Sequence, residues 1–306
     1  MGKCHSSSRK EEPTEAHQHV IVSGSLDKTI RIWKDGQSKT LRGHKKAVLS
    51  VAVCLRKWII VSGSRDQTIR VWSLATKKQI QVLKGHTNSV RFVAISNNGE
   101  WVVSGSDDTT VRVWSLATGI TTLIFTGHSN TVSSVDISTS EEYVVSGGDD
   151  KTLMVWSPTT GEVIRIFESH GNWIKSVVIS KTDQYIASGS YDHTVRVWSL
   201  TSEDPIRILR GHEGVVWSVA ISNDEQFVVS GSGDRTIRVW SLTSGEVIQV
   251  LEGHIGWVLS VRLSSDDKYL VSGGGDYLVK TWDLSTGEQI QELEGHNGVP
   301  WSVNVV

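Results

Sequence analysis

The feature of this sequence that most limits its possible folds is an internal repeat with a period of 42 residues. Six Gly-His pairs and one Ser-His pair supply seven histidines in register: His44, His86, His128, His170, His212, His254 and His296. Seven tryptophans form a second series, 42 residues apart except for a first interval of 39: Trp33, Trp72, Trp114, Trp156, Trp198, Trp240 and Trp282. Periods of about 20 to 50 residues are typical of solenoids, propellers and similar arrays.

Each repeat contains four short segments with the composition of β-strands. In the repeat that begins at Gly211 they are residues 216–222, 227–232, 236–240 and 247–252. Val, Ile, Thr and Trp dominate these segments, and Gly, Ser and Asp separate them, which is the pattern of an antiparallel meander. No segment has a convincing helical period. A four-stranded sheet cannot cover both of its faces alone, whereas seven sheets arranged radially cover one another.

The two ends of the chain predict how the ring closes. One strand remains after His296, while residues 19–42 supply three strands with no Gly-His pair ahead of them. We therefore predict an all-β, seven-bladed β-propeller with four antiparallel strands per blade, in which the C-terminal strand joins the N-terminal blade. The expected organisation is a polar, disordered tail over residues 1–18 and a single propeller over 19–306. The expected blades are 43–84, 85–126, 127–168, 169–210, 211–252, 253–294, and 295–306 combined with 19–42.

The in-phase Gly-His, Ser-Gly-Ser/Gly-x-Asp and Trp series resemble the WD-repeat β-propeller family, and the resemblance covers about residues 19 to 306. The family dipeptide is literal only at Trp282-Asp283; five repeats read Trp-Ser, and the first reads Trp33-Lys34. That position is commonly variable in the family. The resemblance implies a hydrogen-bonded tetrad that ties the loop before the first strand of a blade to its second and third strands. It also implies binding on the narrower face, around the central channel.

Every repeat contains residue types that could suggest hydrolytic chemistry; in the second repeat they are His86, Ser104, Asp108 and Trp114. An active site needs one such constellation, whereas seven copies at a fixed period indicate a structural need. We expect each histidine to bond a turn aspartate, the aspartates being Asp66, Asp108, Asp150, Asp192, Asp234, Asp276 and, for His296, Asp27. The other histidines (His5, His17, His19 and His193) share no spacing, and the two cysteines cannot form a zinc site alone. We therefore expect no catalytic residue, metal or cofactor.

Specificity is expected where the repeats disagree. Three positions per repeat should project around the channel mouth: three and five residues after the histidine, and the residue before the turn aspartate. The first three repeats place mainly charged or small residues there, and the last four place large apolar ones. The candidate partner-binding residues are Trp173, Trp217, Trp257, Trp301, Tyr191, Leu259, Leu26, Lys175, Arg91 and Arg65. Exposed aromatic clusters are typical of binding hot spots for a protein or peptide. The alternative is that these indoles fold inward and plug the channel.

A second reading concerns two of these indoles. Trp217 and Trp301 occupy equivalent positions two repeats apart and could flank a lysine or arginine side chain by cation–π contact. This would make the chain a reader of a basic or modified peptide side chain in the channel mouth.

The tryptophan count supports the choice of candidates. The chain has 13 Trp against 5 Tyr and 4 Phe. Seven belong to the repeat series, and Trp58 and Trp101 are interpreted as sharing a second-strand position that other repeats fill with Tyr or Phe. The remaining four are the candidate binding residues, and they fall in consecutive repeats.

Composition and the N-terminus bound the other possibilities. With 31 Lys and Arg against 33 Asp and Glu, the net charge of −2 does not favour nucleic acid as a partner. No apolar run reaches the roughly 18 residues of a spanning helix, and Cys4 and Cys54 exclude a disulfide framework, so we expect a monomeric cytoplasmic protein. The sequence Met-Gly-Lys-Cys-His-Ser matches a myristoylation pattern at Gly2, with Cys4 available for a second acyl chain. Attachment of this kind would make membrane binding peripheral; the alternative is a chance Met-Gly start.

Overall fold

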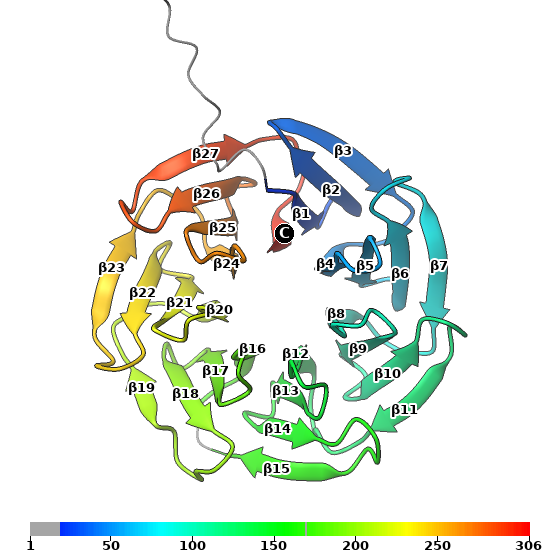
Figure 1. Ribbon diagram of the computed structural model, residues 1–306, viewed down its shortest axis with the longest axis horizontal. Helices are drawn as coiled ribbons and strands as arrows, with labels where there is room; N and C mark the ends of the chain where they lie inside the picture. Colours follow the sequence, from blue (N-terminus) through cyan, green and yellow to red (C-terminus); the bar gives the residue numbers. More distant parts are fainter. Residues whose placement is uncertain (1–18, 169) are drawn as a thin grey trace, which may run out of the picture.

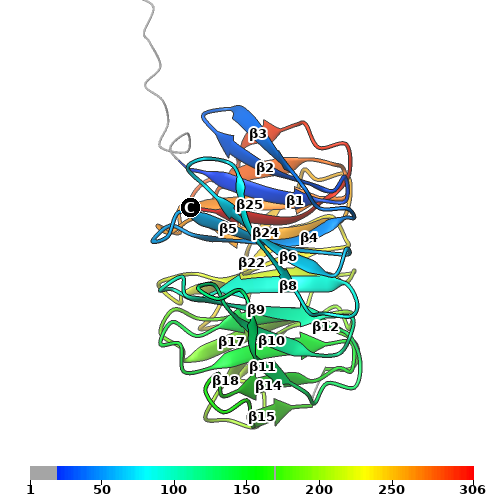
Figure 2. The same cartoon turned by 90° about the vertical axis from the view of Figure 1, so that its right-hand side faces the viewer.

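The computed structural model describes residues 19–168 and 170–306, and these residues form seven four-stranded antiparallel sheets around a common axis (Figure 1). Figure 2 shows the ring edge-on as a disc that is thinner than it is wide. The described residues contain no helix, and therefore none that is long and apolar enough to cross a bilayer. The predicted all-β propeller of seven four-stranded blades is confirmed.

The strands follow one another from the inside of each blade to its outer edge. The first two complete blades are β4 (Val48–Cys54), β5 (Ile59–Ser64), β6 (Thr68–Ser73) and β7 (Gln79–Lys84), then β8 (Val90–Ile95), β9 (Trp101–Ser106), β10 (Val111–Ser115) and β11 (Thr121–Phe125). The third and fourth are β12 (Val132–Ile137), β13 (Val144–Gly148), β14 (Leu153–Trp156) and β15 (Val163–Phe167), then β16 (Ile174–Ile179), β17 (Tyr185–Ser190), β18 (Val195–Ser199) and β19 (Arg207–Leu209). The fifth and sixth are β20 (Val216–Ile221), β21 (Phe227–Ser232), β22 (Ile237–Ser241) and β23 (Val247–Leu251), then β24 (Val258–Leu263), β25 (Tyr269–Gly274), β26 (Val279–Asp283) and β27 (Gln289–Leu293). We number these blades 1 to 6.

Blade 7 contains both ends of the described chain: β28 (Pro300–Val305), β1 (Ile21–Ser25), β2 (Thr29–Lys34) and β3 (Gln37–Arg42). Strands β28 and β1 pair antiparallel, with Ile21 opposite Val305. The backbones of Val20 and Val306 exchange two further hydrogen bonds, of 2.9 and 3.0 Å. Figure 1 shows the C-terminus beside β1. The predicted closure of the ring by the C-terminal strand is therefore confirmed.

Neighbouring blades pack through the glycine of the second strand. A Cβ atom at Gly105 would lie only 2.7 Å from Cγ1 of Val132 in the next blade, and the same close approach recurs at Gly63 and Gly147. Because the glycine has no side chain, the valines and isoleucines of the next inner strand can fill the space between the sheets. Seven buried apolar clusters result, and each of them includes one tryptophan of the repeated series.

A second set of links runs around the inner ring. The hydroxyl oxygen of Ser50 accepts a hydrogen bond of 3.1 Å from the backbone N–H of Val93 in the next blade. Equivalent serines, Ser134, Ser176, Ser218, Ser260 and Ser302, make the same link. Phe92 replaces the serine in blade 2. The inner strands are thereby fixed to one another, which holds the side chains at the channel mouth in register.

The structure corrects the interpretation of Trp58. Trp101 lies opposite Ser115 in the sheet, and the equivalent residue opposite Ser73 is Ile59. Trp58 precedes that position by one residue, in the turn between β4 and β5, where it has a φ of 52° and is 57% exposed. The earlier alignment was therefore one residue out of register: packing in the second strand accounts for Trp101 but not for Trp58.

Candidate functional site

The seven tetrads share one geometry. Histidine Nδ1 lies 2.6–2.9 Å from an aspartate oxygen in every blade. Histidine Nε2 lies 2.7–2.8 Å from a serine hydroxyl on the second strand. The indole N–H of the blade tryptophan donates to the same hydroxyl at 2.7–2.9 Å. The last tetrad joins His296 to Asp27 and Trp33, and so links the two ends of the chain.

This arrangement fixes the protonation state of each tetrad. The aspartate accepts, so Nδ1 carries the proton; the serine hydroxyl then donates to Nε2 and accepts from the indole. Burial lowers the pKa of His44, His170 and His296, which favours the neutral ring. Burial would raise the pKa of Asp66 and Asp108, but hydrogen bonds from histidine and threonine lower it well below the usual range.

The tetrads do not have the access that a catalytic site requires. Ser104 is fully buried, and its hydroxyl is committed to His86 and Trp114. The same is true of the serine in each of the other six blades, so no tetrad serine faces a space that a substrate could enter. Among residues 19–168 and 170–306, no group of three or more His, Cys, Asp or Glu side chains could hold a metal ion.

Above the tetrads, the histidine loops and the aspartate turns contact each other. The residue before each turn aspartate donates its backbone N–H, over 2.7–3.0 Å, to the carbonyl of the residue three after the histidine. Two of the three variable positions are therefore adjacent in every blade. We call this end of the ring the His-loop face. It comprises the loops 45–47, 87–89, 129–131, 171–173, 213–215, 255–257 and 297–299, and the turns 65–67, 107–109, 149–151, 191–193, 233–235, 275–277 and 26–28.

One side of this face holds a continuous aromatic cluster, made of Trp173, Tyr191, Trp217, Trp257 and Trp301. Ring centroids are 5.1 Å apart from Trp173 to Tyr191 and 5.4 Å from Tyr191 to Trp217. Trp217 then contacts both Trp257 and Trp301 at 6.0 Å. Trp173 and Trp257 are 40% and 56% exposed, whereas Trp217 and Trp301 are partly buried. The cluster therefore combines an exposed outer part with an inner part at the channel mouth.

The other side is polar and internally paired. Arg91 forms an ion pair with Asp107, and Lys175 Nζ donates to Asp149 at 2.6 Å. Ser133 Oγ donates to the same carboxylate at 2.8 Å. Lys175 also lies over the Trp173 ring, 4.8 Å from its centroid, where the two sides of the face meet. Burial lowers the pKa of Lys175, an effect that Asp149 opposes.

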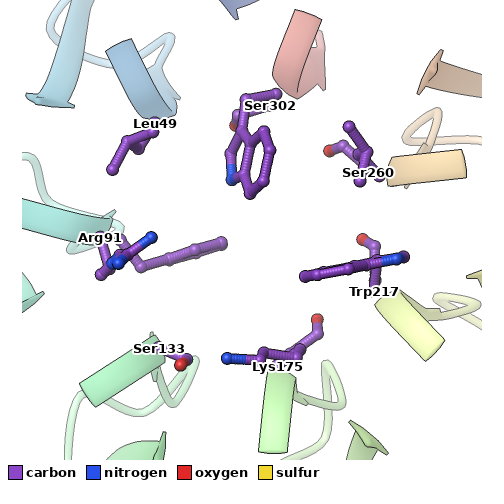
Figure 3. A pocket seen from close by; sticks show the side chains of 12 residues that line it. Leu49, Arg91, Ser133, Lys175, Trp217, Ser260 and Ser302 are labelled. Atoms are coloured by element: carbon purple, nitrogen blue, oxygen red, sulfur yellow. The ribbon is translucent and has the colours of Figure 1, made fainter. Parts of the chain in front are cut away.

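The two sides enclose a small cavity of about 70 Å³ at the channel mouth. Figure 3 shows Leu49, Arg91, Lys175 and Trp217 reaching into this space from different blades. One water needs about 10–15 Å³, and ligand pockets for drug-sized molecules measure about 300–1,000 Å³. The cavity has room for a few waters or the end of one side chain, and none for a cofactor.

Three of the proposed contact residues occupy different environments from the indoles. Leu259 is only 7% exposed and lines the channel wall, Leu26 is half-buried, and Arg65 is exposed. Gly2 and Cys4, the candidate acylation residues, lie outside the described residues.

The geometry does not fit a cation between Trp217 and Trp301. Their centroids are 6.0 Å apart with an interplanar angle of 69°, so the edge of one ring contacts the face of the other. A cation flanked by two rings needs its own contact distance from each of them. The two rings would have to separate before this reading could apply.

Two exposed residues of the His-loop face were not among the sequence candidates. Ile255 is 81% exposed and Tyr277 is 53% exposed, and both belong to blade 6, as Trp257 does. They follow the histidine and the turn aspartate directly. In the other repeats these positions hold polar residues or glycine: Lys45, Thr87, Ser129, Gly171, Glu213 and Asn297 after the histidine, and Gln67, Thr109, Lys151, His193, Arg235 and Lys28 after the aspartate. A comparison of these two positions would have found both residues from sequence.

Comparison with known families gives one result. A family model described as WD domain, G-beta repeat matches seven segments, residues 14–34, 36–73, 77–115, 119–157, 161–199, 203–241 and 245–283. These segments make up more than half of the chain. No curated protein matches the sequence closely enough to count as a relative.

Proposed function

Since the chain belongs to the family of WD domain, G-beta repeat proteins, we propose that it is a non-enzymatic scaffold that binds a protein or peptide on its His-loop face. Propellers of this family are generally protein-interaction scaffolds, but a shared fold does not by itself select a partner or a face. The observation that carries the proposal is the aromatic cluster, whose outer members Trp173 and Trp257 present large rings to solvent.

The chemistry of the cluster supports this choice of face. Tryptophan and tyrosine dominate binding hot spots because they bury a large area and lose little conformational freedom. Truncating such a residue in an interface costs about 2 kcal/mol or more. The polar side contributes less, because Arg91 and Lys175 already have carboxylate partners that a ligand would have to displace.

Two glycines keep the indoles uncovered. Gly233 and Gly275 precede the turn aspartate in blades 5 and 6, where blades 1 to 4 carry Arg65, Asp107, Asp149 and Tyr191. A Cβ atom at Gly275 would lie 3.3 Å from the backbone nitrogen of Trp257, and one at Gly233 would lie 3.5 Å from Nε1 of Trp217. A side chain at Gly233 would lie against the Trp217 ring, and one at Gly275 against the backbone of Trp257, so glycine leaves room for a partner at both positions.

Two finer statements belong to the same proposal. The protein is taken to be cytoplasmic and monomeric, with peripheral membrane attachment if Gly2 and Cys4 are acylated. A reader of a basic or modified side chain between Trp217 and Trp301 is the less favoured function, because the two rings contact each other.

The test is affinity capture from cell extract with three forms of the full chain: wild type, Trp173→Ala/Trp257→Ala, and Trp58→Ala. Trp58 is the matched control, because it is exposed to the same degree as Trp257 but lies in a turn at the opposite end of the ring. We expect specific partners to be lost from the double variant and retained by Trp58→Ala. Equal capture by all three forms would refute the His-loop face as the binding site.

A further inference from the structure

The charge on the His-loop face is uneven, and its basic part lies close to the aromatic cluster. Lys28 in blade 7 and Lys45, Lys46 and Arg65 in blade 1 are all exposed. None of these four forms an ion pair with another residue of the described ranges. The carboxylates on the same loops, Asp27 and Asp66, are committed to the tetrads below. This part of the face therefore presents four exposed cations to solvent, while its two carboxylates are bonded within the tetrads.

The opposite part of the face is less basic. The turns of blades 2 and 3 carry four carboxylates, Asp107, Asp108, Asp149 and Asp150, and their cations Arg91 and Lys175 are already ion-paired. Only Lys151 adds an exposed cation there. An acidic ligand is therefore attracted more strongly to blades 7 and 1 than to blades 2 and 3.

Blade 6 supplies the most exposed apolar residues of the face. The Ile255 backbone N–H donates to Asp276 of the tetrad at 3.1 Å, which fixes the backbone while the side chain stays 81% exposed. Trp257, on the same loop, and Tyr277, on the adjoining turn, are 56% and 53% exposed. Gly256 allows this arrangement, because a Cβ atom there would lie 2.5 Å from the backbone nitrogen of Asp276. The loop thus lies close to the turn, and the apolar side chains of both segments are exposed to solvent.

Blade 7 lies between the apolar and basic parts. Its loop reads Asn297, Gly298 and Val299, which carry no charge and little bulk. A Cβ atom at Gly298 would lie 2.8 Å from the backbone nitrogen of Asp27, so this loop also lies close to its turn. A short extended segment can therefore contact blade 6, cross blade 7 and reach blade 1.

We propose that the partner segment is an acidic peptide with a bulky apolar residue. The apolar residue contacts Ile255, Trp257 and Tyr277, and aspartate or glutamate side chains pair with Lys28, Lys45, Lys46 and Arg65. This inference rests on the proposed function, since it names the chemistry of the ligand for the same face. The exposed charges set orientation and association rate, and their contribution falls as salt is raised.

The test starts with a random peptide library displayed on phage and selected against the purified full chain. We expect the selected peptides to combine Asp or Glu with a neighbouring Trp, Phe, Leu or Ile. Selected peptides that are neutral or basic, or a selection with no binders, would overturn the inference. A single-stranded oligonucleotide that binds as tightly as the best peptide would overturn it too.

Variants then locate the bound peptide by fluorescence anisotropy. Lys45→Glu/Lys46→Glu/Arg65→Glu and Ile255→Ser/Tyr277→Ser should each weaken binding by about tenfold or more. Lys151→Glu is the matched control, a charge reversal on the same face in blade 3, and should leave affinity unchanged. Melting curves of each variant exclude a folding defect. Equal weakening by Lys151→Glu would contradict the assigned location.

The outcome also separates this inference from the proposed function. Peptides that need Trp173 and Trp257 but carry no acidic residue would refute the acidic partner and leave the His-loop face standing. Peptides that bind the Trp173→Ala/Trp257→Ala variant as well as wild type would refute the face itself.

Discussion

The two sides of the channel mouth have opposite chemistry on the same scaffold. On the polar side, Arg91 and Lys175 meet carboxylates of the turns at hydrogen-bonding distance. On the aromatic side, Trp217 contacts Trp257 and Trp301, and the outer rings remain open to solvent. The tetrads beneath both sides are the same. Stability is therefore a shared property of all blades, while recognition depends on a few positions above them.

The two sides also differ in the free energy that a partner gains by binding to them. A partner that contacts the polar side must break existing ion pairs and hydrogen bonds, so the net gain is small. A partner on the aromatic side removes apolar surface from water, worth about 25 cal/mol per Å², and breaks no polar contact to do so. We therefore expect partner binding to depend mainly on the aromatic side, and the stability of the fold to depend on the blades of both sides.

Acid should have the largest effect, because it acts on all seven tetrads at once. The lowered pKa of His44, His170 and His296 means that the unfolded chain takes up protons first, so stability is lost as pH falls below about 6.5. The lowered pKa of the tetrad aspartates adds a steeper loss as pH falls below about 4. Asp136, whose pKa burial raises to about 6, and Asp267, whose pKa burial also raises, act in the opposite sense, but they are two carboxyls against seven tetrad aspartates.

Melting temperatures followed by circular dichroism from pH 8 to pH 3 would measure this effect. We expect one cooperative transition that moves to lower temperature, with both sides of the ring unfolding together. Two separate transitions, or a melting temperature that stays constant down to pH 4, would contradict the claim that all seven tetrads stabilise the ring together.

The second prediction concerns one tetrad beneath each side. Trp156→Ala, in blade 3 below the polar side, and Trp240→Ala, in blade 5 below the aromatic side, each remove an indole that is 1% exposed. Each should lower the free energy of unfolding by about 3–5 kcal/mol. Trp257→Ala, on the face itself, should cost about 1 kcal/mol, because the residue is 56% exposed and loses its ring contact with Trp217.

Urea unfolding of the three variants would check these values. Below the temperature at which they unfold, Trp156→Ala and Trp240→Ala should keep partner binding, whereas Trp257→Ala should lose it. A tetrad variant that is as stable as wild type but cannot bind would contradict the structural role of the tetrads.

The sequence predicts most of what is repeated and less of what is unique. The sets of His44, Asp66 and Trp72 and their equivalents follow from the period, because a residue needed in every blade recurs seven times. The pairing of β28 with β1 follows from the number of strands at the two ends of the chain: one after His296 and three in residues 19–42. Trp58 was misplaced because a shift of one residue in a turn leaves the composition of the next strand unchanged.

The unique contacts depend on side-chain direction, which periodicity does not encode. Lys175 belongs to blade 4 but pairs with Asp149 of blade 3, so no pattern within one repeat predicts the pair. The contact of Trp217 with Trp301 depends likewise on how two rings two blades apart turn toward each other. Ile255 and Tyr277 differ: they are exposed apolar residues at positions that are polar or glycine in the other repeats, so a comparison of the repeats at these positions identifies both.

The smallest expected effect is on the polar side. Asp107→Asn removes the partner of Arg91, whose side chain is 33% exposed and can turn to water. Because partly exposed ion pairs contribute about 0.2–1 kcal/mol, the loss of unfolding free energy should stay within that range. Partner binding should not change, since the aromatic cluster is untouched.

Tyr277→Ser is the counterpart on the aromatic side, with little effect on stability and a measurable loss of affinity. Urea unfolding and peptide anisotropy would compare the two variants. We expect Asp107→Asn to change only the free energy of unfolding and Tyr277→Ser to change only the affinity for the peptide. If Asp107→Asn weakened binding as much as Tyr277→Ser, the partner would have to contact both sides of the mouth. The polar side would then be part of the recognition surface, and the division of this face into a paired side and a binding side would fail.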